Sequence, residues 1–133
     1  MKTIGFIKPF YEEDFSKEIE EYLKEEINSD REMLIEYMQK GKLCVALMGC
    51  VEDPLDEKYD DNFIAYMASY TDGVYLWPQY VIEFMKKYPN FHLDQEFVDY
   101  VKENKDKPID PSKEVVERIE REYFAYSDWG NPE

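Results

Sequence analysis

The chain has 133 residues, of which 44% are hydrophobic and 17% aromatic, and its 16 basic and 31 acidic side chains give a formal net charge of −15. This length fits a single acidic α+β domain spanning residues 1–133, and the apolar content is enough to offset the entropy cost of folding. The acidic balance argues against nucleic acid as a partner, because no basic stripe is present to displace counterions, and against anionic membrane surfaces.

No apolar run in the sequence approaches the ~20 residues needed to cross a bilayer. The N-terminal residues lack a long apolar segment and a small-residue cleavage site, so we do not expect them to act as a signal peptide. We therefore expect a cytoplasmic protein. The spacing of Cys44 and Cys50 matches neither a CxxC redox pair nor a zinc knuckle, so reduced, mostly buried thiols are expected.

The N-terminal third has the pattern of two helices. Between residues 10 and 27, apolar side chains recur every three or four positions, which predicts an amphipathic helix begun by Pro9. Ser29 and Glu32 match a capping box. A second helix is therefore expected to begin there. It should end at Gly41, because glycine can adopt the positive φ that often ends a helix.

The middle of the chain predicts three strands. Residues 42–51 are a continuous apolar run, typical of a buried strand, and the acidic residues 51–62 are expected to form a surface loop. Residues 63–69 and 74–77 have strand-forming composition, and the turn signal at 71–73 joins them into an antiparallel hairpin.

Three more helices are expected in the C-terminal half. Their starts are marked by Pro78, by Asp94 as an N-cap, and by Asp110 followed by Pro111. The predicted fold is therefore α+β, with about five helices packed on a small antiparallel sheet of about three strands.

The sequence offers little for catalysis or metal binding. His92 is the single histidine, and neither a GxSxG nor a Gly-rich phosphate loop is present. Residues 52–61 hold six carboxylates in ten positions but lack the ligand order and central glycine of a calcium loop. We expect no enzyme activity, no cofactor and no metal, although a pair of carboxylates of the glycosidase type stays open as a third reading.

Residues 71–88, which include Asp72, Gly73, Tyr75, Trp77 and Pro78, together with residues 92–98, resemble a DGxWxWP-containing pattern. That pattern occurs in small bacterial immunity-like proteins encoded beside contact-dependent or other polymorphic toxins. The similarity covers about residues 33–101. Tyr75 stands where a first Trp is usual in the family, and Asp94 stands where Pro is frequent.

The resemblance implies stoichiometric inhibition of a cognate toxin C-terminal domain, and many such toxins are basic nucleases. An acidic inhibitor gains fast, steered encounter with a basic partner. The alternative is a non-catalytic structural or adaptor module, such as a homodimer that buries surface aromatics. On the first hypothesis the expected partner-binding residues lie in the acidic loop: Asp53, Asp56, Glu57, Asp60 and Asp61, with Tyr59 as an anchor.

Overall fold

The computed structural model describes residues 2–8, 10–11, 14–56 and 62–126, and this part of the chain has an α+β fold, as predicted. The strands are β1 (Lys2–Thr3), β2 (Ile7–Lys8), β3 (Lys17–Glu18), β4 (Lys42–Glu52), β5 (Phe63–Thr71) and β6 (Tyr75–Pro78). The helices are the short 3-10 helix η1 (Ile19–Glu21), α1 (Arg31–Met38), α2 (Gln79–Lys87), α3 (Gln95–Asn104) and α4 (Lys113–Tyr126).

The larger sheet has the strand order β1-β6-β5-β4, in which β4, β5 and β6 are antiparallel neighbours and β1 pairs with β6 in parallel. A second sheet consists of the parallel strands β2 and β3. The expected antiparallel sheet of about three strands is thus confirmed for β4 to β6 but was incomplete. The additional strands have only two residues each, too few for an alternating pattern to be visible.

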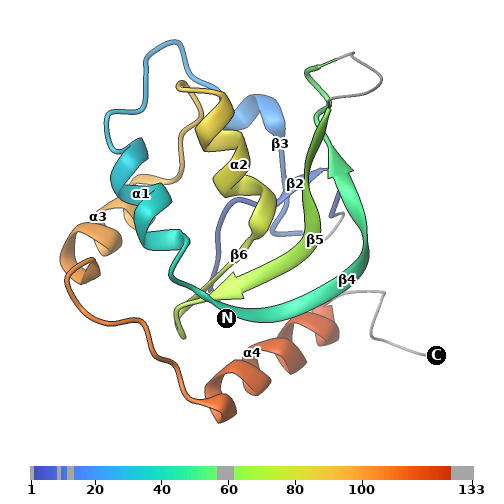
Figure 1. The fold of residues 1–133 in the computed structure, drawn as a ribbon, viewed down its shortest axis with the longest axis vertical. Coiled ribbons are helices and arrows are strands. Elements are labelled where there is room, and N and C mark those ends of the chain that lie inside the picture. Colours follow the sequence, from blue (N-terminus) through green and yellow to red (C-terminus); the bar gives the residue numbers. More distant parts are fainter. Residues whose placement is uncertain (1, 9, 12–13, 57–61, 127–133) are drawn as a thin grey trace.

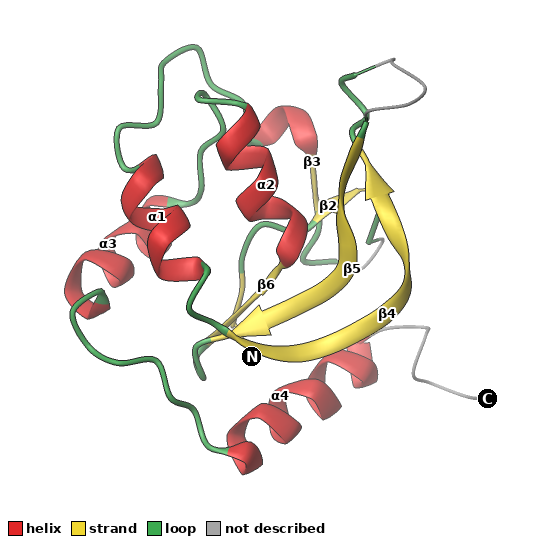
Figure 2. Cartoon of the chain, viewed as in Figure 1, coloured by secondary structure: helices red, strands yellow, loops and turns green. Residues whose placement is uncertain are grey.

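Helices cover the larger sheet from both sides. Helices α1, α2 and α3 gather on one side, where α2 packs against β5, whereas α4 lies along β4 on the other side (Figures 1 and 2). Their apolar faces enclose a core rich in aromatic rings. Its largest fully buried members are Trp77, Tyr11, Tyr80, Tyr123, Phe6, Phe84, Phe91 and Phe97.

The predicted helix at residues 10–27 is wrong. Several of its apolar side chains are buried, but apart from the short η1 its described backbone pairs with other segments of the chain. Lys17 donates its amide to the carbonyl of Phe6, and Lys24 donates to that of Asn90, both at 3.0 Å. Tyr22 is held by its hydroxyl, which donates to the Phe6 carbonyl at 2.7 Å. Long-range pairing has therefore overridden the local helical periodicity.

The other four helices are confirmed, with corrected ends. Helix α1 begins at Arg31 after Asp30, which makes no side-chain cap hydrogen bond, so the expected capping box of Ser29 and Glu32 was wrong. Helix α4 begins at Lys113. Ser112, whose hydroxyl accepts the amide of Val115 at 3.2 Å, caps it two residues after the predicted cap at Asp110. Gly41 follows α1 as expected, but it does not have a positive φ. It is required for space, since a Cβ there would lie 2.5 Å from Cζ2 of the fully buried Trp77.

The turn between β5 and β6 is organised by Asp72. Its Oδ1 accepts the amides of Val74 at 2.9 Å and Tyr75 at 2.8 Å. Its Oδ2 accepts the hydroxyls of Tyr37 at 2.5 Å and Tyr100 at 2.8 Å. One carboxylate therefore joins the turn to α1 and α3, and Gly73 supplies the positive φ of 101° that the turn requires.

Candidate protein-binding site

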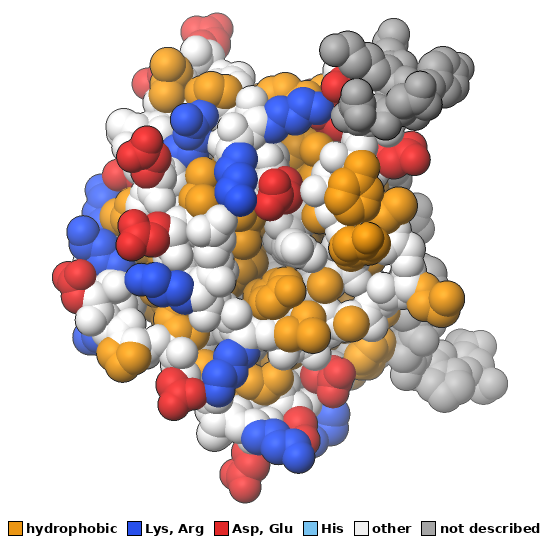
Figure 3. Space-filling view, viewed as in Figure 1, with side chains coloured by type: hydrophobic (Ala, Val, Ile, Leu, Met, Phe, Trp, Pro, Cys, Tyr) orange, Lys and Arg blue, Asp and Glu red, His pale blue; other side chains and the backbone are white. Residues whose placement is uncertain are grey.

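The β4–β5 hairpin carries no charged side chain over most of its length. Residues 43–51 and 63–71 contain no Asp, Glu, Lys or Arg, although 35% of the chain is charged. Several apolar side chains nevertheless face solvent, and Figure 3 shows hydrophobic side chains gathered over this hairpin. The set, called the hairpin patch below, consists of Leu43 (53% exposed), Ala46, Met48 (96%), Cys50, Phe63 (53%) and Tyr66 (67%). Exposed apolar clusters of this kind mark interaction surfaces.

Strand pairing brings members of the hairpin patch side by side. Cys50 lies opposite Tyr66. The rings of Phe63 and Tyr66 meet edge to face, with centroids 5.3 Å apart. Two exposed aromatic rings in contact offer a rigid apolar area at a low cost in conformational entropy, which suits an anchor for another protein.

The opposite face of β4 is covered by α4. Cys44 is buried there, and its Sγ lies 3.5 Å from the carbonyl oxygen of Val116. Burial, with a smaller contribution from Glu120, raises the pKa of the Cys44 thiol to about 12. Both cysteines are free in the structure. Cys50, however, is exposed, and the expectation of burial was wrong for it.

The acidic loop is fixed at its base by Asp53. The side chain of Asp53 is completely buried, its Oδ1 accepts the amide of Leu55 at 2.8 Å, and its Oδ2 accepts a hydrogen bond from Lys87 Nζ at 2.6 Å. The same Oδ2 accepts the hydroxyl of Tyr88 at 2.5 Å. A buried carboxylate with three donors is satisfied within its own chain. Asp53 therefore shapes the base of the loop.

Asp56 lies at the surface of the same cluster. Its carboxylate pairs with Lys87 at 3.1 Å, and its side chain remains 22% exposed. Glu57, Tyr59, Asp60 and Asp61 lie outside the described residues. The structure thus brings together Asp53 and Asp56, and the partner-binding role of the whole loop stays a prediction.

Hydrogen bonds and burial set the protonation of this cluster. The bond to Asp53 is the largest cause that raises the pKa of Lys87 above its ordinary value. Burial and then the bond to Asp53 raise the pKa of Tyr88 to about 12. Both groups therefore keep their protons, and with them their hydrogen bonds to Asp53, throughout the neutral range.

Two parts of this site were missed from the sequence. The charge-free stretches of β4 and β5 were visible in the sequence, but they predicted only buried strands. Which face of a strand remains exposed depends on how the helices pack against it. Lys87 and Tyr88 gave no signal, because they lie 34 and 35 positions from Asp53.

His92 has a structural role. Its ring Nε2 lies 2.8 Å from the carbonyl oxygen of Glu26, and its amide donates to the carbonyl of Tyr22 at 2.7 Å. Both contacts fasten the segment after α2 to the N-terminal part of the chain. Within the described ranges, no three His, Cys, Asp or Glu side chains are grouped closely enough to hold a metal ion.

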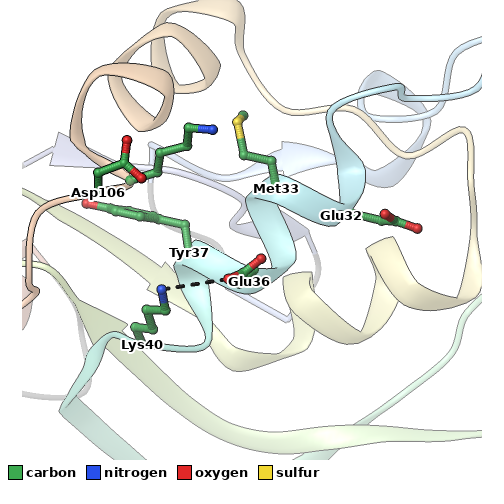
Figure 4. Close-up of a pocket in the computed structure, with 7 residues that line it drawn as sticks. Glu32, Met33, Glu36, Tyr37, Lys40 and Asp106 are labelled. Carbon is green, nitrogen blue, oxygen red and sulfur yellow. Dashed lines mark ion pairs between the residues drawn. The ribbon is translucent and has the colours of Figure 1, made fainter.

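A separate groove of about 380 Å³ lies where α1 meets the end of α3 (Figure 4). Its charged groups have mixed sign, and Glu36 pairs with Lys40 across one helical turn at 3.9 Å. The hydroxyl of Tyr37 is already committed to Asp72. None of the lining residues is a Ser, Cys or His. They are Glu32, Met33, Glu36, Tyr37, Lys40, Lys105 and Asp106.

The buried tyrosines predict an alkaline limit to stability. Burial is the main cause that raises the pKa of six tyrosines, which reaches about 12 for Tyr88 and Tyr100. The other four are Tyr22, Tyr37, Tyr75 and Tyr80. Because the unfolded chain loses these protons near pH 10, the stability contribution is complete below about pH 10 and falls as the pH rises towards 12.

Tyrosinate absorbance recorded against pH tests this expectation. Only some of the 12 tyrosines of the chain should ionise near pH 10. The others should ionise only at the higher pH at which circular dichroism shows that the protein unfolds. A single step in which all of them titrate near pH 10 in the folded protein would contradict it.

No helix in the described residues is both long and apolar enough to cross a membrane. Comparison of the chain with protein-family models, with curated proteins and with solved structures gives no match. The functional hypothesis therefore rests on the hairpin patch, the Asp53 cluster and the charge of the chain.

Proposed function

We propose that this chain is an immunity-type protein that binds a cognate toxin domain and neutralises it by stoichiometric inhibition. The observation that carries the proposal is the hairpin patch, an exposed and uncharged apolar surface on a chain of net charge −15. An apolar centre bordered by charged groups is the usual anatomy of a protein interface. Glu52, which lies opposite Phe63, and the partly exposed Asp56 supply such a border on one side.

The face of the hairpin suits this role better than its edge. Strand β4 has no neighbouring strand on its outer side among the described residues, so a partner strand could in principle be added there. Its pairing with β5, however, shifts register at three places, and Gly49 has a φ of 115°. Bulges of this kind bend an edge strand away from further pairing. Contact through side chains of the hairpin patch is therefore favoured.

The net charge favours a basic partner. A strongly acidic surface attracts a cationic protein over several ångströms and accelerates their encounter, and the attraction weakens as salt screens it. The same charge opposes close approach of a second copy, which weighs against the alternative of a homodimeric structural module. Light scattering distinguishes the two, because a monomer is expected from the first reading and a dimer from the second.

Neutralisation in cells tests the proposal. The protein encoded next to this chain in its native genome is expressed in a bacterial host from an inducible promoter, with or without this chain. Growth arrest that co-expression relieves, together with a one-to-one complex in light scattering, is the expected result. A neighbour that is harmless, or that remains toxic despite equal amounts of this chain, would oppose the proposal.

Charge reversal in the loop should slow association. Replacing Asp56, Glu57, Asp60 and Asp61 with lysine changes the net charge from −15 to −7, since each reversal adds two charges. We expect an association rate lower by about tenfold or more at low salt and a weaker dependence on salt, measured by stopped-flow with the toxin domain.

A matched control carries the same total change elsewhere. Glu32 and Glu36 of α1 and Glu96 and Glu103 of α3 are exposed and lie away from the hairpin (Figure 1). If their reversal slows association as much as reversal in the loop does, only the total charge matters and the loop is not part of the interface.

A further inference from the structure

Lys87, at the end of α2, joins three parts of the chain. Its Nζ donates to Asp53 at the end of β4 at 2.6 Å and to Asp56 in the loop at 3.1 Å. The next residue, Tyr88, donates its hydroxyl to Asp53 as well. The end of the helix thus holds Asp53 and Asp56, the two predicted partner-binding residues that the structure describes.

The two contacts differ in burial. The Asp53 side chain is inaccessible to solvent, whereas that of Asp56 is 22% exposed and that of Lys87 is 36% exposed. A buried carboxylate that loses its cation is strongly disfavoured, so the contact with Asp53 is the fixed one. The contact with Asp56 is at the surface and adds orientation more than stability.

Asp53 in turn holds the backbone of the loop. Its Oδ1 accepts the amide of Leu55 at 2.8 Å, and its carbonyl oxygen accepts the amide of Asp56 at 3.3 Å. Its own amide donates to the carbonyl of Asn62 at 2.6 Å, across the base of the loop. The position of Leu55 and Asp56 therefore depends on where Asp53 is held.

We infer that Lys87 is a positioning residue, which fixes the segment from Asp53 to Asp56 against α2 so that Leu55 and Asp56 face a partner. The expected effect of Lys87 on toxin binding rests on the proposed function. The expected effect of Lys87 on the position of the loop does not, so each can be contradicted without the other.

The direction in which Lys87→Met changes the binding of a cation distinguishes a positioning role from an effect of net charge alone. Lys87→Met makes the chain more acidic by one charge, so steering alone would strengthen the binding of a cation. Positioning predicts weaker binding at the loop. Lys86→Met is the matched control, since Lys86 is the neighbouring lysine on the same helix, pairs with Glu83 at 3.4 Å and changes the charge equally.

The first measurement is amide hydrogen exchange in the free protein. The amides of Leu55 and Asp56 should exchange about tenfold faster or more in Lys87→Met, the loss expected for a hydrogen bond to a charged group. They should be unchanged in Lys86→Met and largely restored in Lys87→Arg. Unchanged exchange in Lys87→Met would overturn the inference.

The second measurement uses octalysine as a cationic probe. Its binding is followed by the shifts of the Asp53, Leu55 and Asp56 amides in nuclear magnetic resonance. Binding at these residues should be at least threefold weaker in Lys87→Met than in Lys86→Met. If the two variants bind equally, Lys87 does not position the loop for a cation, whatever the neutralisation experiment gives.

Lys87→Met leaves Asp53 without its cation and can lower the stability of the whole fold. A double variant, Asp53→Asn with Lys87→Met, removes the uncompensated charge as well. If it folds like the parent in circular dichroism and still shows fast exchange at Leu55 and Asp56, the loss of position is separate from unfolding. Exchange at the parent rate in the double variant would overturn the inference.

Discussion

Replacing Phe63 and Tyr66 together with serine is expected to weaken binding of the toxin domain by about 30-fold or more while leaving the fold intact. The two rings are 53% and 67% exposed, so the folded chain gains little from burying them. In an interface, by contrast, a buried aromatic anchor typically contributes about 2 kcal/mol or more. Calorimetric titration with the toxin domain measures the affinity, and urea unfolding measures the stability.

Exposed apolar side chains outside the hairpin provide the control. Ile27 and Val74 are 71% and 46% exposed, and neither belongs to the hairpin patch. Serine at both positions should leave the affinity within about threefold of the parent. Equal losses in the two double variants would show that exposed apolar area in general, rather than this surface, governs the affinity.

Replacing Asp72 with alanine is expected to lower the free energy of unfolding by about 2–4 kcal/mol. The change removes the acceptor for two backbone amides and two tyrosine hydroxyls at once. An unsatisfied buried donor costs about 1–3 kcal/mol, and because the turn is only partly buried, some of these donors recover a bond to water. Urea unfolding of the two proteins gives the difference.

Asparagine at the same position separates geometry from charge. Its side-chain oxygen can still accept the amides of Val74 and Tyr75, so Asp72→Asn should lose less stability than Asp72→Ala. The background Tyr37→Phe with Tyr100→Phe has already lost the two hydroxyls that donate to Asp72. In that background Asp72→Ala should cost clearly less, because residues of one network are not additive. An undiminished cost would mean that the hydroxyls do not depend on this carboxylate.

The same turn explains much of the sequence resemblance that suggested immunity proteins. Asp72 and Gly73 build the turn, and Trp77 is fully buried against the backbone at Gly41. These residues define a corner between strand and helix. A functional surface is therefore better sought in the hairpin patch, which lies outside that motif.

The parts of the fold that were predictable from sequence depend on local chemistry. Proline at position 78, the Asp94 boundary and the apolar periodicity of α4 mark three helices, because each signal acts within a few residues of the chain. The turn at Asp72 and Gly73 fixed the β5–β6 hairpin in the same way.

The remaining parts depend on contacts between distant residues. Residues 10–27 have helical spacing, yet Lys24 and Asn28 pair with Asn90 and Pro89. The ion pair of Lys87 with Asp53 joins residues 34 positions apart. Neither contact can be predicted from periodicity, because periodicity describes only neighbouring residues. In residues 10–27 it favours a helix that the distant contacts replace.

The unequal environments of the two cysteines give the protein a built-in attachment point for a reporter. A maleimide dye reacts with the thiolate, which the high pKa and burial of Cys44 suppress, so labelling at neutral pH should go to Cys50 alone. Cys50 lies opposite Tyr66 in the hairpin patch. A fluorophore attached to the unmodified sequence therefore stands within the surface proposed for the toxin domain, where its emission reports occupancy directly.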